Sequence, residues 1–487
     1  MTDSNRLRLT TVREVTLGVT PNTPRMRTAR ITGESLKYEP VFVQSAEIRS
    51  DRMNADPIKI NENNNGGINA EFSYPVPDSP LSDFLRSLMF SDWVNTPTRF
   101  NDGTADSVIT GVAATGGVIT VTTGTAFVAG HLILNSGFTN SGNNGLFKIT
   151  TGSATVPAVG NSLLTDEAAP PAAAKVKVVG FQGASGDLTA LADGIGSTAL
   201  DLTTLGLVPG QWVKVGGTGA GFRFATEACN GWARVSGAIT ATKIPLDNLP
   251  TGWTTDSGTG KTLRVFFGDQ IKNGVTRTSL TIERGFLAQA VPTYIAQAGM
   301  VVGQADINIT TEQLITSNFT FQGLSGSQGT TSLDAAPDAA TTNPIMSANV
   351  NVGRIAEAGA AVVAPNFIRS LQMQINNNLR LITAVGSIGG VDIGVGEIAI
   401  NLTIETYFGS NTLLAKLLAG TVSNLNARAS KNSQAFIWGL PRVTFTGGAP
   451  SAGAKNQDVM LSMTGMVSID DTTNAVLIMD RVEYFEA

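Results

Sequence analysis

The sequence predicts an all-β protein whose core is an internal duplication, with two small β modules inserted into its first half. Short runs rich in Val, Ile and Thr are separated by Gly, Asn, Asp or Pro, and 53 of the 487 residues are glycine. This pattern is typical of many short strands joined by turns. One order of elements also occurs twice along the chain, and such a recurrence decides how the whole fold is interpreted.

The first copy of the repeated unit spans residues 42–90. It is predicted as a strand ending in AEIRS, a polar loop, a glycine pair, the alternating strand INAEFSY and the helix SPLSDFLRSLMF. The second copy begins at Arg369 with SLQMQINN and continues with a loop, Gly396, the strand EIAINLTIETYF and the helix SNTLLAKLLAG. The loops differ in length and few residues are identical, which indicates an old duplication.

The predicted strands of both copies have one apolar and one polar face. In the second copy Ile398, Ile400, Leu402 and Ile404 share one parity, while polar residues take most of the other. This alternation indicates a sheet with one buried and one wet face. The wet faces of the two strands carry amides, hydroxyls and carboxylates, without lysine or arginine.

An insertion interrupts the first copy between about residues 107 and 268. It contains two similar segments, seen in VAGHLIL against VPGQWVKV and in NGLFKI against NGWARV, and each suits a small barrel or sandwich. We therefore expect a discontinuous first core domain (residues 1–105 and 269–328), two inserted modules (107–186 and 187–268), a linker (329–341) and a second core domain (342–487).

The charge and composition exclude several classes of protein. Charged residues make up only 15% of the chain, and the net charge of −5 is spread along it, which argues against a general binder of nucleic acid or anionic membranes. No apolar run approaches the roughly 20 residues of a membrane span. The N-terminal segment MTDSNRLRLTTVREV lacks the apolar stretch of a signal peptide, so we expect synthesis and folding in a cytoplasm.

The sequence offers little for catalysis. His131 is the only histidine and Cys229 the only cysteine, so a catalytic triad or a metal cluster has few residues to draw on. Both are more simply explained as structural side chains within the inserted modules. We expect no enzymatic activity, no cofactor and no metal site.

Several motifs in both core domains resemble the major tail tube proteins of long-tailed bacteriophages. They are EIRSDRM at Glu47, the strand GGINAEFSY and the helix after it, the strand SNFTFQGLSG, and INNNL with its own strand and helix. The resemblance does not extend to the insertion. It implies tandem β-sandwich domains whose inner strands join around a ring into one large β-barrel, and rings that stack into the tube conducting DNA.

The resemblance also implies partners. Most members place six domains in a ring, so a duplicated chain implies a trimeric ring with pseudo-sixfold symmetry. The tape measure protein and double-stranded DNA are then expected in the lumen, with the tail terminator and tail tip proteins at the tube ends, in a virion tail assembled in the host bacterial cytoplasm. No membrane is involved in this hypothesis.

Two sets of site residues follow from this hypothesis. The polar faces of the repeated strands would line the lumen, where a polyanion must pass without being held. The loop at residues 50–65 would contact the next ring. The predicted lumen-facing residues are Asn69, Glu71, Ser73, Gln372, Gln374, Glu397, Asn401, Thr403 and Glu405, and the predicted stacking residues are Asp51, Arg52, Asp56 and Lys59.

An alternative hypothesis is a β-rich phage surface or receptor-binding protein whose inserted modules bind host glycans. Trp212 and Trp232 of the second module would then stack on a sugar, although aromatic residues of small β modules more often belong to the core. Assembly into stacked rings, as opposed to discrete cell-binding particles, would distinguish the two hypotheses.

Overall fold

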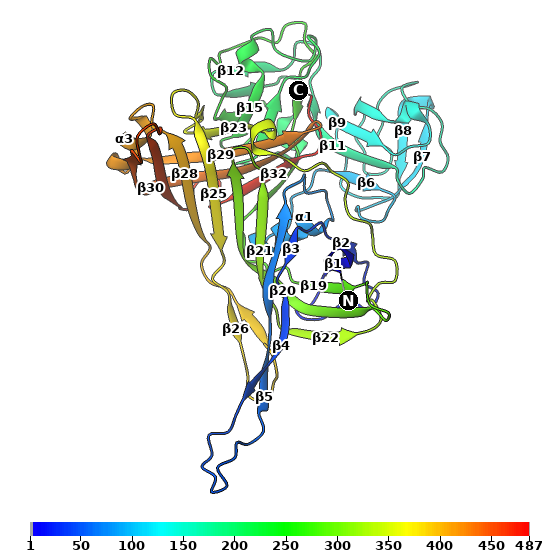
Figure 1. Cartoon of the computed structure of the whole chain (residues 1–487). Coiled ribbons are helices and arrows are strands. Elements are labelled where there is room, and N and C mark those ends of the chain that lie inside the picture. Colours follow the sequence, from blue (N-terminus) through cyan, green and yellow to red (C-terminus); the bar gives the residue numbers. More distant parts are fainter. Residues whose placement is uncertain (1–2, 487) are drawn as a thin grey trace.

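A computed structural model describes residues 3–486, and the duplication is its main feature (Figure 1). Seven elements of the first copy have an equivalent, in the same order, in the second. The first copy contains β1 (Leu7–Arg13), β4 (Lys37–Val43), β5 (Ile58–Glu71), α1 (Pro80–Met89), β19 (Leu280–Phe286), β20 (Thr293–Thr310) and β21 (Thr316–Gln322). The second contains β23 (Val352–Glu357), β25 (Ile368–Asn376), β28 (Ala399–Tyr407), α3 (Thr412–Ala419), β29 (Val422–Lys431), β30 (Gln434–Ser451) and β31 (Met460–Val467).

The equivalence of the copies extends to single hydrogen bonds. The Phe72 N–H donates to the Ile315 carbonyl at 2.7 Å, and in the second copy the Phe408 N–H donates to Val459 at 2.9 Å. β20 and β30 carry a bulge at the same place, after Val302 and after Phe445. A bulge is a built feature of a strand, so its repetition identifies one structural unit used twice.

Each copy is a sandwich of two sheets, and β20 and β30, each 18 residues long, cross from one sheet to the other. Their first halves pair with β19 and β29, and their second halves pair with β21 and β31. The two copies share one core. Phe72 of the first copy lies 5.1 Å from Phe436 and 4.9 Å from Trp438 of the second, between ring centroids.

Eight strands from both copies form one continuous antiparallel sheet, which we call the joint sheet. Its order is β4, β5, β21, β20, β25, β28, β31 and the second half of β30. The copies meet where β20 pairs with β25 over seven residue pairs, from Gln304 with Asn376 to Thr310 with Ser370. One core and one sheet therefore fix the copies to each other.

Both helices form where the sequence predicts them. Ser79 is the N-cap of α1 and accepts a hydrogen bond from the Ser82 N–H at 3.4 Å, while Pro80 occupies the first turn, where its missing N–H costs nothing. Phe84, Leu85 and Leu88 bury the inner face of α1 in the core. α3 ends at Gly420, which takes the left-handed conformation that favours glycine.

One predicted strand boundary was wrong. β4 ends at Val43, so residues 46–50 lie in a loop, and β5 begins at Ile58, inside the predicted loop at residues 50–65. The run of asparagines at 63–65 is typical of a turn, but pairing with β4 satisfies its backbone groups in a strand. The result is a long hairpin that projects from the body of the molecule (Figure 1).

The insertion leaves after α1 and returns at β19. In the second copy only Gly420 and Thr421 separate the equivalent helix and strand. The two ends of the insertion lie side by side, since Val94 and Gln270 exchange backbone hydrogen bonds of 2.8 and 3.1 Å. Its strands are β6 (Thr98–Phe100), β7 (Ile109–Ala113), β8 (Val118–Val121), β9 (His131–Ser136), β10 (Gly145–Lys148), β11 (Lys175–Gln182), β12 (Thr189–Leu191), β13 (Gly194–Gly196), β14 (Trp212–Val215), β15 (Gly231–Val235), β16 (Lys243–Asp247) and β17 (Arg264–Phe266).

The two inserted modules form one body. β11 of the first module pairs with β17 of the second within a ten-stranded sheet, and one buried apolar cluster extends from Ile109 to Phe267. β6, which the sequence analysis assigned to the first core domain, pairs with β11. The remaining elements are β2 (Arg27–Thr28), β3 (Gly33–Glu34), β18 (Asp269–Lys272), β22 (Ser325–Gly329), α2 (Ala348–Asn351), β24 (Ala360–Ala361), β26 (Arg380–Ile382), β27 (Asp392–Gly394) and β32 (Ile478–Val482).

The insertion packs on the side of the second copy that faces away from the joint sheet. Along β30, Phe436 and Trp438 point into the shared core, whereas Ala435 and Ile437 point the other way and pack against Trp212 and Trp232 of the insertion. The alternating side chains of β30 therefore contact the shared core on one side and the inserted body on the other.

A buried ionic cluster joins the insertion to both copies. Asp269 accepts hydrogen bonds from Lys177 of β11 at 2.7 Å and from Arg481 of β32 at 2.8 Å, and Arg481 also donates to Ser82 of α1 at 2.7 Å. Burial alone would raise the pKa of Asp269, but Lys177 and Arg481 outweigh it and hold the pKa well below its usual range. Asp480 is also fully buried but has no such partners, and burial raises its pKa well above the usual range.

These two carboxyl groups should respond oppositely to the same substitution. We expect Asp269→Asn to lower the free energy of unfolding at pH 7 by about 3–5 kcal/mol, because it leaves two buried cations without their counter-charge. Asp480→Asn should raise it by about 1–3 kcal/mol, because it removes a buried, poorly satisfied carboxylate. Chemical denaturation of both variants at pH 7 measures the difference.

The pH dependence provides the control. A depressed pKa stabilises the fold above the unfolded value and is lost on acidification, so the deficit of Asp269→Asn should shrink as the pH falls below about 5. A carboxyl group whose pKa is raised by folding destabilises the folded state as the pH rises above its unfolded pKa. The gain from Asp480→Asn should therefore vanish near pH 4 and grow above it. Equal effects of both substitutions at every pH would contradict this assignment.

Candidate functional site

The exposed face of the joint sheet is a continuous polar surface that crosses both copies. Two rows of directly opposed residues run over six strands, from β5 to β31. The first row is Asn69, Asn318, Asp306, Gln374, Asn401 and Met466, and the second is Glu71, Thr316, Asn308, Gln372, Thr403 and Thr464. Neither row contains lysine or arginine.

The structure brings most of the predicted lumen-facing residues onto this one face. Asn69, Gln372, Gln374 and Asn401 are exposed, and Glu71, Thr403 and Glu405 are half-buried. Glu397 is exposed but precedes the start of β28. Ser73 does not share the face: it is only 6% exposed, because the chain at Ile345 forms a bridge with it.

Sequence reasoning missed the members of the face that lie on β20 and β21. Asp306, Asn308 and Asn318 alternate with buried Ala305, Ile307 and Phe319, which is the same signal that was recognised in β5 and β28. The pairing of these strands with the repeated unit could not be predicted from alternation. Asp306 is held in place by Gln304 and Gln374, which donate to its carboxylate at 3.0 and 3.1 Å.

Positive charge is confined to the margins of this face. Lys37 is exposed on β4, the first strand of the joint sheet, opposite Asn65. Arg369 lies at the start of β25 and is 3.8 Å from the Glu405 carboxylate. The centre of the face thus presents amides, hydroxyls and a few carboxylates, which are groups that do not attract phosphate.

The joint sheet has two open edge strands, and each is the counterpart of a strand that is paired within the chain. β4 pairs with β5, and residues 445–451 of β30 pair with β31, so one side of each strand is left open. β4 is the counterpart of β25, and β30 is the counterpart of β20. Since β20 and β25 pair within the chain, the two open edges are complementary in strand type and direction.

The projecting hairpin, residues 40–62, carries the predicted stacking residues, and we call it the arm (Figure 1). Asp51, Arg52 and Asp56 are exposed in its loop, and Lys59 lies on β5. Two of these charges are already paired within the arm: Asp51 lies 2.6 Å from Arg49, and Lys59 contacts Glu62. The arm also exposes six large apolar side chains: Phe42, Val43, Ile48, Met53, Ile58 and Ile60.

A groove of about 330 Å³, with apolar residues and also Arg354 and Arg369 in its wall, lies at the end of the joint sheet away from the arm. It is located where β20 ends at Thr310 and β25 begins at Ile368. Val363 and Phe367 in its wall are 59% and 55% exposed. Opposite ends of the joint sheet therefore carry an apolar projection and a recess with exposed apolar residues in its wall.

The inserted body uses its chemically notable residues for packing. His131 is buried, its Nδ1 accepts from the Val128 N–H at 3.1 Å, and burial lowers its pKa to about 4. The Cys229 thiol donates to the Thr254 carbonyl at 3.0 Å, and burial raises its pKa. Trp212 and Trp232 are 3% and 6% exposed, so neither ring face is open to a sugar.

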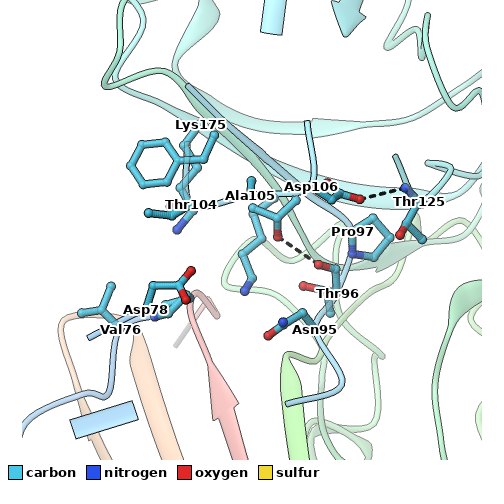
Figure 2. A pocket seen from close by; sticks show the side chains of 14 residues that line it. Val76, Asp78, Asn95, Thr96, Pro97, Thr104, Ala105, Asp106, Thr125 and Lys175 are labelled. Carbon is cyan, nitrogen blue, oxygen red and sulfur yellow. Dashed lines mark hydrogen bonds between the residues drawn. The ribbon is translucent and has the colours of Figure 1, made fainter. Parts of the chain in front are cut away.

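A cavity of about 250 Å³ lies where the insertion meets the first copy (Figure 2). Its two lysines are neutralised, since Lys175 contacts Glu483 and Lys177 contacts Asp269. Between residues 3 and 486 no group of three or more His, Cys, Asp or Glu side chains is placed to hold a metal ion. Over the same residues no helix is long and apolar enough to cross a membrane.

Comparison with known protein families gives one match, and it occurs twice. A family model described as phage tail tube protein matches residues 4–242 and again residues 243–467. A comparison with curated protein sequences gave no match. The repeated match agrees with the repeated elements of the structure, although the two matched ranges meet inside the insertion.

Proposed function

The chain belongs to the phage tail tube protein family and is a structural protein of the virion tail, and we propose that three copies close each ring of the tube. The pairing of β20 with β25 carries this proposal, because it is a complete example of how one repeated unit joins the next. Repeating it between chains places β30 of one copy beside β4 of its neighbour. Three chains then supply six repeated units to one closed barrel, which leaves no sheet edge open.

The polar face of the joint sheet is proposed as the wall of the lumen. A conduit must let DNA pass without binding it, and each cation that met a phosphate would add a salt-dependent contact. The amides and hydroxyls of the two rows, with the carboxylates of Glu71 and Asp306 among them, suit this requirement. The tape measure protein would occupy the lumen before DNA, and the tail terminator and tail tip proteins would cap the two ends of the tube.

The remaining surfaces are assigned by their position relative to that wall. The insertion packs on the face of β30 away from the joint sheet, so in a ring it lies outside the tube. The arm of one ring is proposed to enter the groove of the next. Such a head-to-tail contact between unlike surfaces does not close on itself and therefore builds a filament. No step in this assembly requires catalysis.

Ring closure can be tested by disulfide trapping. Ala449 and Lys37 are the counterparts of Asp306 and Gln374, which face each other in the β20–β25 pairing. We expect the double variant Lys37→Cys, Ala449→Cys to form covalent trimers on oxidation, visible by mass spectrometry, because Cys229 is buried and does not compete.

Two controls define the register of this contact. Asp306→Cys with Gln374→Cys should link within one chain and leave its mass unchanged. Lys37→Cys with Pro450→Cys is displaced by one residue and should link poorly. Covalent hexamers would refute the trimeric ring, and the absence of any link between chains would refute the edge assignment.

The lumen assignment predicts a defect in DNA passage. Phage carrying Gln374→Lys and Asn401→Lys should assemble tails of normal length but release DNA several-fold more slowly at low salt, because the lysines bind phosphates in transit. The delay should diminish as salt is raised. Ser141→Lys, on the exposed surface of the insertion, is the control, and a release rate equal to this control would exclude the lumen assignment.

The stacking proposal predicts that apolar side chains of the arm, and not its charged side chains, hold the rings together. We expect Ile48→Ser with Met53→Ser to yield rings that no longer polymerise, since two exposed apolar side chains of the arm are lost. Asp51→Asn with Arg52→Gln should still yield tubes. Negative-stain microscopy distinguishes rings from tubes, and the reverse result would show that the charged residues hold the rings together.

A further inference from the structure

Two arginines face each other where the second copy meets the insertion. Arg354 on β23 and Arg428 on β29 are directly opposed in the register of these antiparallel strands. Like charges in this position destabilise a sheet unless something neutralises them. The pair lies outside the joint sheet and the arm, and Arg354 lines the groove assigned above to stacking.

The guanidinium groups are fixed but incompletely hydrogen-bonded. The Arg428 guanidinium lies 5.0 Å from the centre of the Trp232 ring, and Arg354 donates one hydrogen bond to the Gly359 carbonyl. The Nε atoms of both arginines are buried and have no hydrogen-bond partner. A buried donor without a partner is costly, so each Nε indicates a missing acceptor.

A third cation adds to the charge of this pair. The Lys214 ammonium of β14 donates to the Val215 and Gly216 carbonyls at 3.1 and 3.0 Å. Burial and then the charge of Arg428 lower the pKa of Lys214 to about 8. Burial and the charge of Arg354 lower the pKa of Arg428 to about 10.

None of the described residues supplies a carboxylate to these three cations. Within residues 3–486, no Asp or Glu oxygen lies within 4.0 Å of Arg354, Arg428 or Lys214. The charges of Glu227 and Glu486 act on Lys214, but these two side chains form ion pairs with Arg223 and Arg264. By contrast, Arg481 and Lys177 share Asp269.

We propose that Arg354 and Arg428 form a binding site for an oxoanion. Guanidinium groups donate forked hydrogen bonds that match carboxylate and phosphate oxygens, and two of them on neighbouring strands can grip one such group from two sides. The anion supplies the counter-charge that the two guanidinium groups lack. Its source is either free phosphate or a carboxylate side chain of a neighbouring copy in the tube.

Inorganic phosphate is the probe for this site. Thermal unfolding of the unassembled chain should shift to higher temperature as phosphate is added at constant ionic strength, and the shift should saturate, since a ligand of the native state stabilises it. The shift should be lost in Arg428→Gln and in Arg354→Gln. Arg234→Gln is the control, because Arg234 on β15 of the insertion is already paired with Asp247 at 2.5 Å and should leave the phosphate response intact.

A second measurement separates ligand binding from a structural role. In phosphate-free buffer Arg428→Gln should be at least as stable as the original chain, because one of two like charges is removed. Stabilisation by phosphate no greater than by chloride, or its survival in both arginine variants, would overturn the proposal. Assembled tubes that still bind phosphate identify a free anion as the occupant, whereas tubes that have lost the binding seen in free chains identify a carboxylate of the neighbour.

Discussion

The backbone pairing of β20 with β25 is the contact on which the rest of the architecture depends. It joins two sandwiches through one sheet, so the exposed faces of both copies align in continuous rows that are polar except at Met466. It also determines which strands remain at the edges. Because the same unit stands on both sides of this contact, with matching bulges in β20 and β30, the contact is the template for the junction proposed between neighbouring chains.

Periodicity predicted the parts of this site that depend only on local pattern. The parity of Asn401, Thr403 and Glu405 against Ile400, Leu402 and Ile404 was sufficient to place their face. Ser73 has the same parity as Asn69, yet Ile345, more than 270 residues away in sequence, covers it. Burial by a distant segment leaves no trace in local alternation, and neither does the choice of partner strand that brought Asp306 into the rows.

The arm shows a second limit of sequence patterns. Residues 58–65 were predicted as a loop because asparagine is depleted in strands. A strand is nevertheless stable when its partner satisfies the backbone and its side chains face solvent. The charged residues of the loop were predicted to contact the next ring. In the structure those charges partly pair with one another, and it is the apolar side chains that remain without partners.

The insertion explains why the two copies have diverged in their outer faces. It belongs to the first copy in sequence, but its tryptophans cover β30 of the second, and Asp269 at its end binds Arg481 near the end of the chain. The inserted body therefore packs against the second copy, although it is inserted in the sequence of the first. This arrangement also separates charges: Arg354 and Arg428, which oppose each other without a carboxylate, lie at the seam with the insertion, whereas the two rows of the joint sheet contain no cation and Lys37 lies at its edge. A tube that carries its unpaired positive charge away from the surface proposed to meet DNA can bind anions outside without retarding the polyanion inside.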